Sequence, residues 1–99
     1  MSLPTFGDGT ISTSAVSNHR GLLKLMLRLP AMRGTLQMLN ARSDGMRSLC
    51  EAFDDATATY DILMKAGVTR NQQLIEEYEG IIKDLEAEVI RDCLNYVAK

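Results

Sequence analysis

The sequence predicts an all-α protein built around one long antiparallel helical hairpin, and three observations support this. Leucine and alanine lead the composition, and no stretch alternates β-branched and aromatic residues as a strand would. Apolar side chains recur every three or four residues through two long segments, 31–66 and 70–97. A helix-stop signal at Gly67 is followed two residues later by a helix-start signal at Thr69, which is typical of a turn between two helices.

The chain of 99 residues has the length of one domain. Residues 1–13 are rich in Gly, Ser and Thr without periodicity, so we expect a flexible tail there. We expect a single helical domain over 14–99 that begins with a helix at about 14–29. Pro30 should end that helix, because the residue before a proline disfavours helical geometry.

The strongest periodicity lies in 31–66, where side chains spaced alternately by four and three residues predict one coiled-coil-like helix. A Ser-Asp-Gly run at 43–45 is also a turn and capping signal. We favour a helix that is continuous or locally bent at this point, and a break is the alternative. The positions that form the seam are Met32, Leu36, Leu39, Ser43, Met46, Cys50, Phe53, Thr57, Tyr60 and Met64.

The second arm, 70–97, repeats the pattern with Ile75, Tyr78, Ile82, Leu85 and Val89, continued by Cys93. A two-helix pair needs only this narrow seam, and further apolar residues widen it. The width predicts self-association into a helical bundle, a homo-oligomer with a dimer favoured. The candidate self-association residues are Leu74, Ile81, Ile90 and Leu94.

Charge is unevenly divided, with +4 in residues 1–50 and −6 in residues 51–99. Such asymmetry favours attraction between the halves, within the fold or across a dimer, and it is also found in proteins with a half that faces nucleic acid or a membrane. Arg20, Lys24 and Arg28 recur every four residues and form one basic stripe on the amphipathic helix 19–29. These three cations are the candidate contacts for a protein partner or for a membrane surface.

No pattern of catalytic, metal or cofactor chemistry is present in the sequence. His19 is the single histidine, and two distant cysteines do not make up a zinc ligand set. The segment around Gly67 superficially resembles a DNA-binding helix-turn-helix, but the following helix begins with several carboxylates that phosphates would repel. We therefore expect no catalytic residues, no cofactor, no metal and no nucleic-acid partner.

We expect a reducing, cytoplasmic location, with an organellar targeting segment at 1–33 as the alternative. The sequence favours a non-catalytic helical interaction protein that self-associates through its hairpin. The alternatives are a peripheral membrane-surface protein and a small subunit or regulator of an enzyme. No motif points to a particular family.

The predicted hairpin also determines how far apart the two cysteines lie. If both arms rise equally from the turn, Cys50 and Cys93 lie about eight residues apart along the hairpin, or roughly 12 Å. A disulfide tolerates Cα separations only up to about 7 Å. The sequence therefore predicts two free, buried thiols.

Overall fold

The computed structural model describes the backbone of residues 5–98 and the side chains of residues 15–97. Over this range the chain forms helices and no strand, which confirms the all-α class. The elements in order are α1 (Thr5–Arg28), a 3₁₀ turn η1 (Pro30–Met32), α2 (Arg33–Arg42), α3 (Asp44–Ala66) and α4 (Gln72–Ala98).

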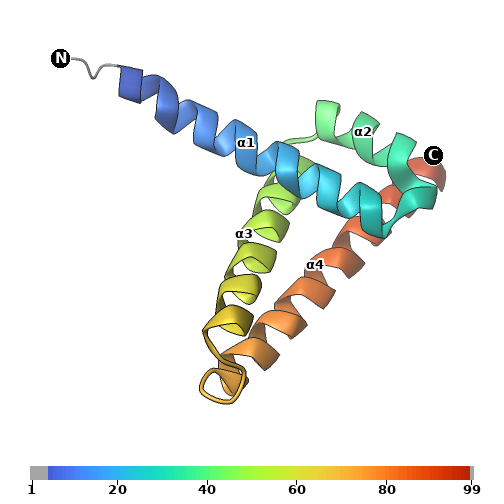
Figure 1. Cartoon of the computed structure of the whole chain (residues 1–99). Helices are drawn as coiled ribbons and strands as arrows, with labels where there is room; N and C mark the ends of the chain where they lie inside the picture. The colour runs from blue at the N-terminus through green and yellow to red at the C-terminus, as the bar shows by residue number, and fades with distance from the viewer. Residues whose placement is uncertain (1–4, 99) are drawn as a thin grey trace.

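Helices α3 and α4 form the predicted antiparallel hairpin and diverge from the turn at 67–71 toward their other ends (Figure 1). Helix α1 crosses both arms near the open end of the hairpin, and α2 lies beside α1. The Cα atoms span 45 × 44 × 18 Å, and a helix is about 10–12 Å across with its side chains. The molecule is therefore thin, with α1 laid over one face of the hairpin.

Helix α1 begins at Thr5, inside the segment 1–13 that was expected to be a flexible tail. Residues 1–4 of that expected tail lie outside the described residues. Gly, Ser and Thr disfavour helix only by up to about 1 kcal/mol each, and no proline interrupts the run from Thr5 to Arg28. A helix already formed over 15–28 extends without a new nucleation step, which accounts for the earlier start.

The expected break before Pro30 is present, because Leu29 leaves the helix with φ −126° and ψ 64°. A continuous helix over 31–66, in contrast, is wrong. Ser43 adopts an extended conformation (φ −120°, ψ 120°) that ends α2 and begins α3. Its hydroxyl accepts a hydrogen bond from the Met46 amide at 3.1 Å, and its own amide donates to the Leu39 carbonyl at 2.8 Å. One serine thus caps both helix ends, so the capping signal outweighed the periodicity.

The turn of the hairpin begins where the sequence predicts it but ends later. Gly67 has φ 129°, a conformation that favours glycine, and its amide bonds back to the Leu63 carbonyl at 3.2 Å. The helix-start signal at Thr69 does not begin α4, because the chain forms a turn in which the Asn71 amide donates to the Gly67 carbonyl. Helix α4 therefore starts at Gln72 rather than at about 70.

The core is one cluster to which all four α-helices contribute, and it includes most of the predicted seam positions. On α3 the seam is buried from Met46 to Thr57, whereas Met64 near the turn is exposed. Both cysteines are buried and free, as expected, and burial raises the pKa of each thiol. The buried apolar side chains of the cluster are Leu25, Leu36, Met46, Cys50, Phe53, Ala56, Ile82, Val89 and Cys93.

Helix α1 approaches α3 more closely than side chains would ordinarily permit. Gly21 is buried at the crossing, and a Cβ atom placed on it would lie 2.6 Å from the carbonyl carbon of Cys50 and closer still to the carbonyl oxygen. The obstacle is backbone and not a flexible side chain, so it has no easy way to move. Only glycine fits at this position without a shift of one helix.

We expect Gly21→Ala to lower the free energy of unfolding by about 1–3 kcal/mol or more, because α1 must move away from α3 and loosen the core. Gly80→Ala is the matched control, since a Cβ on this glycine of α4 meets no atom within 4 Å. The control should raise stability by about 0.5–1 kcal/mol through helix propensity. Urea unfolding followed by circular dichroism measures both, and equal stability of the two variants would contradict the close crossing.

Candidate functional site

The basic stripe of α1 lies along the hairpin, and its side chains remain partly exposed. Arg20, Lys24 and Arg28 are spaced by four residues, which places them on one side of the helix. Arg20 and Lys24 reach a single carboxylate of α3, and Arg28 reaches a carboxylate of α4. The structure thus brings all three candidate residues into ion pairs within the chain.

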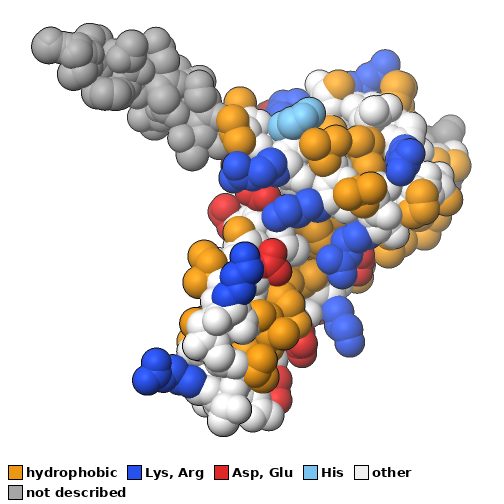
Figure 2. All heavy atoms as spheres, viewed as in Figure 1, with side chains coloured by type: hydrophobic (Ala, Val, Ile, Leu, Met, Phe, Trp, Pro, Cys, Tyr) orange, Lys and Arg blue, Asp and Glu red, His pale blue; other side chains and the backbone are white. Residues whose placement is uncertain are grey.

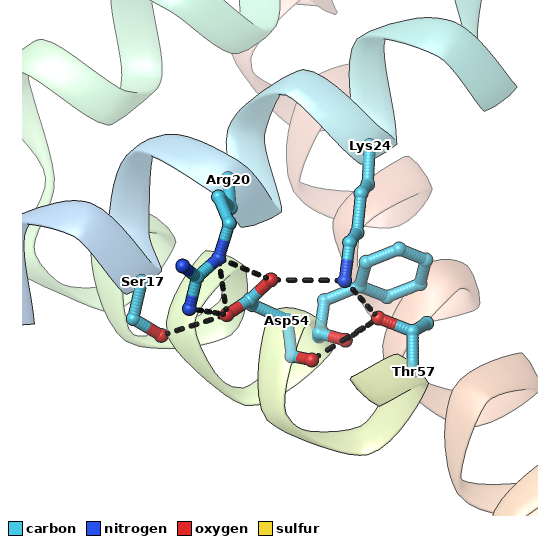
Figure 3. Close-up of polar contacts among 6 residues, drawn as sticks. Ser17, Arg20, Lys24, Asp54 and Thr57 are labelled. Carbon is cyan, nitrogen blue, oxygen red and sulfur yellow. Dashed lines mark hydrogen bonds and ion pairs between the residues drawn. The ribbon is translucent and has the colours of Figure 1, made fainter. Parts of the chain in front are cut away.

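Asp54 is the centre of this contact, with only 2 % of its side chain exposed (Figure 3). The guanidinium of Arg20 donates through Nη2 to Oδ2 at 3.1 Å, and Nζ of Lys24 lies 2.9 Å from Oδ1. The hydroxyl of Ser17 donates to Oδ2 at 3.2 Å. Three residues on successive turns of α1 therefore contact the same buried carboxylate, and Arg20 does so through both Nε and Nη2.

Two opposing effects set the pKa of Asp54. Burial is the largest and disfavours the charged form, which by itself would raise the pKa. The hydrogen bonds and positive charges of Arg20 and Lys24 together outweigh it, so the pKa lies below its ordinary value. The carboxylate is consequently ionised at neutral pH and holds α1 against α3.

Two further contacts extend the docking of α1. Nζ of Lys24 also donates to the hydroxyl of Thr57 at 2.7 Å, and that hydroxyl bonds to the Phe53 carbonyl at 2.8 Å. Nε of Arg28 donates to Glu86 on α4 at 2.9 Å, while its guanidinium lies 5.4 Å from the centre of the Phe53 ring. Helix α1 thereby contacts both arms of the hairpin. Its cations pair with acids of α3 and α4, so the positively charged first half of the sequence is attracted to the negatively charged second half.

Asp54 was not singled out from the sequence, although a signal was present. It follows Cys50 by four residues and precedes Thr57 by three, so it shares their side of the helix. An acid beside a buried seam, in a chain with a separate basic stripe, is a candidate partner for that stripe. The sequence did not distinguish it from the adjacent Asp55, which is exposed.

The four candidate self-association residues do not form one surface. At 100° per residue around α4, Leu74 and Ile81 lie on one side of the buried seam, and Ile90 and Leu94 lie on the other. Leu74 and Ile81 are 45 % and 44 % exposed, Leu94 is 56 % exposed and Ile90 is half-buried. Glu86, the partner of Arg28, falls on the side of Ile90 and Leu94, so the end of α1 reaches that side of α4, although Leu94 remains exposed.

A cleft of about 630 Å³ lies where the two arms diverge below α1, and all three helices line it. On the face seen in Figure 2, Lys and Arg side chains gather where α1 crosses the hairpin, and hydrophobic side chains lie beside and below them. Within the cleft the hydroxyl of Tyr60 donates to Glu79 at 3.0 Å, and this bond raises the pKa of Tyr60.

Within residues 15–97, whose side chains are described, no group of three or more His, Cys, Asp or Glu is placed to hold a metal ion. The same part of the chain has no helix that is both long and apolar enough to cross a bilayer. Comparison of the chain with family models, curated proteins and solved structures finds no match. The function is therefore argued from the geometry of the chain itself.

We expect Asp54→Asn to lower the free energy of unfolding at neutral pH by roughly 1–3 kcal/mol. This is less than for a fully buried pair, because both cations are partly exposed. The wild-type carboxylate, whose pKa is lowered on folding, contributes stability above the unfolded-state pKa of about 4. That contribution is lost as the pH falls through the folded-state pKa.

Urea unfolding between pH 3 and pH 7 tests this expectation, with Asp55→Asn as the matched control on the exposed neighbour. The gap between wild type and Asp54→Asn should narrow toward pH 3, whereas the control should follow wild type throughout. A gap that is independent of pH would show that the charge of Asp54 does not hold α1.

Proposed function

We propose that the protein is a non-catalytic helical interaction protein that self-associates through its hairpin. The observation that carries the proposal is the exposure of Leu74 and Ile81 on α4. Nearly half of each large apolar side chain remains in water although the core beneath is fully formed. Exposed apolar positions that recur along one side of a helix are typical of surfaces that pack against another chain.

These residues lie on the face of the hairpin away from α1. On α3, Asp54 contacts α1, and at 100° per residue Leu63 lies on the opposite side of the seam. Leu74 and Ile81 are likewise opposite Glu86 around α4. We call Leu63, Leu74 and Ile81 the rear patch.

A symmetric dimer is the assembly that the rear patch supports best. Full burial of a leucine-sized side chain contributes about 1.5–3 kcal/mol, so a half-exposed one retains about half of that. In a two-fold interface each residue is used twice, once from either copy. Ile90 and Leu94, which the sequence analysis included, lie on the other side of α4 and are not part of this proposal.

The membrane-surface alternative receives less support. It requires Arg20, Lys24 and Arg28 to face lipid headgroups. In the folded chain these cations contact Asp54 and Glu86 instead, and releasing them would leave a carboxylate buried without partners. The cations are better explained as the means by which α1 docks.

We also propose a reducing compartment, the cytoplasm, for this protein. Cys50 and Cys93 are buried free thiols in a core without a disulfide among the described residues. Free cysteines persist where glutathione and thioredoxin keep thiols reduced. Their raised pKa and burial keep them from acting as nucleophiles, which agrees with a non-catalytic role.

We expect multi-angle light scattering over a micromolar dilution series to give a mass of at least two chains for the wild type. Leu74→Ser combined with Ile81→Ser should raise the dissociation constant ten-fold or more, because the patch loses its apolar area. Ile62→Ser is the matched control, since Ile62 is more exposed but points away from the seam of α3. A monomeric wild type at every concentration would refute self-association, and equal effects of both variants would refute the rear patch.

A second measurement separates docking of α1 from membrane binding. Lys24→Glu combined with Arg28→Glu should lower the free energy of unfolding by roughly 1 kcal/mol or more, because acids would then face Asp54 and Glu86. Wild-type protein should remain in the supernatant when vesicles of anionic lipid are sedimented. Unchanged stability of the variant, together with co-sedimentation of the wild type alone, would favour the membrane alternative.

A further inference from the structure

The cleft below α1 has cations and apolar side chains on its walls, and the self-association surface does not use it. Its lining includes Lys24, Leu27 and Arg28 of α1 and Ile82 and Lys83 of α4. Its volume of about 630 Å³ lies within the range of small-molecule sites.

Lys83 differs from the other cations of this cleft in its lack of a carboxylate partner among the described residues. It follows Glu79 by four residues, the favourable order for an ion pair on a helix. Glu79 instead accepts the hydrogen bond of Tyr60 from the other arm of the hairpin. Among the described residues, Lys83 consequently has no carboxylate within ion-pair distance, and its three N–H donors remain available.

Arg28 also keeps donors for a ligand. Its guanidinium carries five N–H groups, and within the described part of the chain it bonds to Glu86 through Nε. The N–H groups on its two Nη atoms make no hydrogen bond there. The contact with Glu86 fixes the position of the group, so these donors are oriented before any ligand arrives.

The same cleft offers apolar surface next to these charges. Leu27, near the end of α1, has 74 % of its surface exposed. Ile82 lies on the opposite wall as part of the core cluster. A ligand with an apolar portion would remove the surface of Leu27 from water.

We propose that this cleft binds a small amphipathic carboxylate, whose acid group contacts Lys83 and Arg28 and whose hydrocarbon tail lies against Leu27 and Ile82. The carboxylates that also line the cleft belong to Asp61 and Glu79, and Glu79 is turned toward Tyr60. Lys24 and Arg28 are already paired with Asp54 and Glu86. The preference for an anionic ligand therefore rests on the ammonium of Lys83, which has no partner among the described residues, and on the free Nη donors of Arg28. The proposal goes beyond the proposed function, and the cleft lies on the face opposite the rear patch.

The test is a titration of the full chain with sodium octanoate, followed by the amide chemical shifts of Thr57, Tyr60 and Ile82, all of which line the cleft. These amides should shift with saturation in the millimolar range or below. Octan-1-ol has the same tail without the charge and should bind at least about five-fold more weakly, because it loses the charge contacts with both Lys83 and Arg28 and one such partly exposed contact is worth about five-fold. No saturable shift of these amides with octanoate up to about 10 mM would overturn the proposal.

Lys83→Gln is the deciding variant, because Lys83 has no acid partner and its loss should not disturb the fold. It should weaken octanoate about five-fold and leave octan-1-ol unchanged. Lys65→Gln, at an exposed lysine near the end of α3 that does not line the cleft, is the matched control and should bind octanoate like the wild type. Equal octanoate affinity of the wild type and Lys83→Gln would overturn the assignment of the acid group. Because neither variant changes the rear patch, this outcome is independent of the oligomeric state.

Discussion

The close crossing of α1 over α3 is the constraint on which the rest of this structure depends. Gly21 lets the two backbones meet at the carbonyl of Cys50, where any side chain would hold them apart. The approach brings the basic stripe of α1 onto the carboxylate of Asp54, which is buried in the folded chain. It also carries the end of α1 across to α4, where Arg28 contacts Glu86. The open end of the hairpin is thus closed by α1 together with α2, which contributes Leu36 to the core.

The charge cluster at Asp54 determines which face of α1 packs against the hairpin, which the apolar residues of α1 alone do not determine. Leucines and Met26 cover most of the surface of α1 from Leu22 to Leu29, so several rotations of the helix would bury similar apolar area. Only one rotation places Arg20 and Lys24 over Asp54, and any other leaves a buried carboxylate without partners. A buried ion pair often adds little net stability, but here it selects the face by which α1 packs.

The position of α1 also divides the hairpin into two faces with different properties. The face that α1 crosses is rich in cations and includes a cleft with an unpaired lysine among the described residues. The face away from α1 is left with the exposed leucine and isoleucine of α4. Both proposals follow from this division, one for a small anionic ligand and one for a second copy of the chain. Since the two sites share no residue, each is open to its own experiment.

The sequence by itself determined the helical class, the break at Pro30, the turn at Gly67 and most of the buried seam, because these depend on local geometry and on periodicity along one chain. It did not decide between a continuous helix and a capped break at Ser43. The same seam residues are expected to be buried in either case, because α2 folds back onto the core after the break. Only the tertiary structure revealed the role of Asp54, which depends on a helix more than thirty residues away in the chain. It likewise decided how much of each apolar side chain of α4 remains exposed, because periodicity shows that a stripe is apolar but not which part of it the rest of the chain covers.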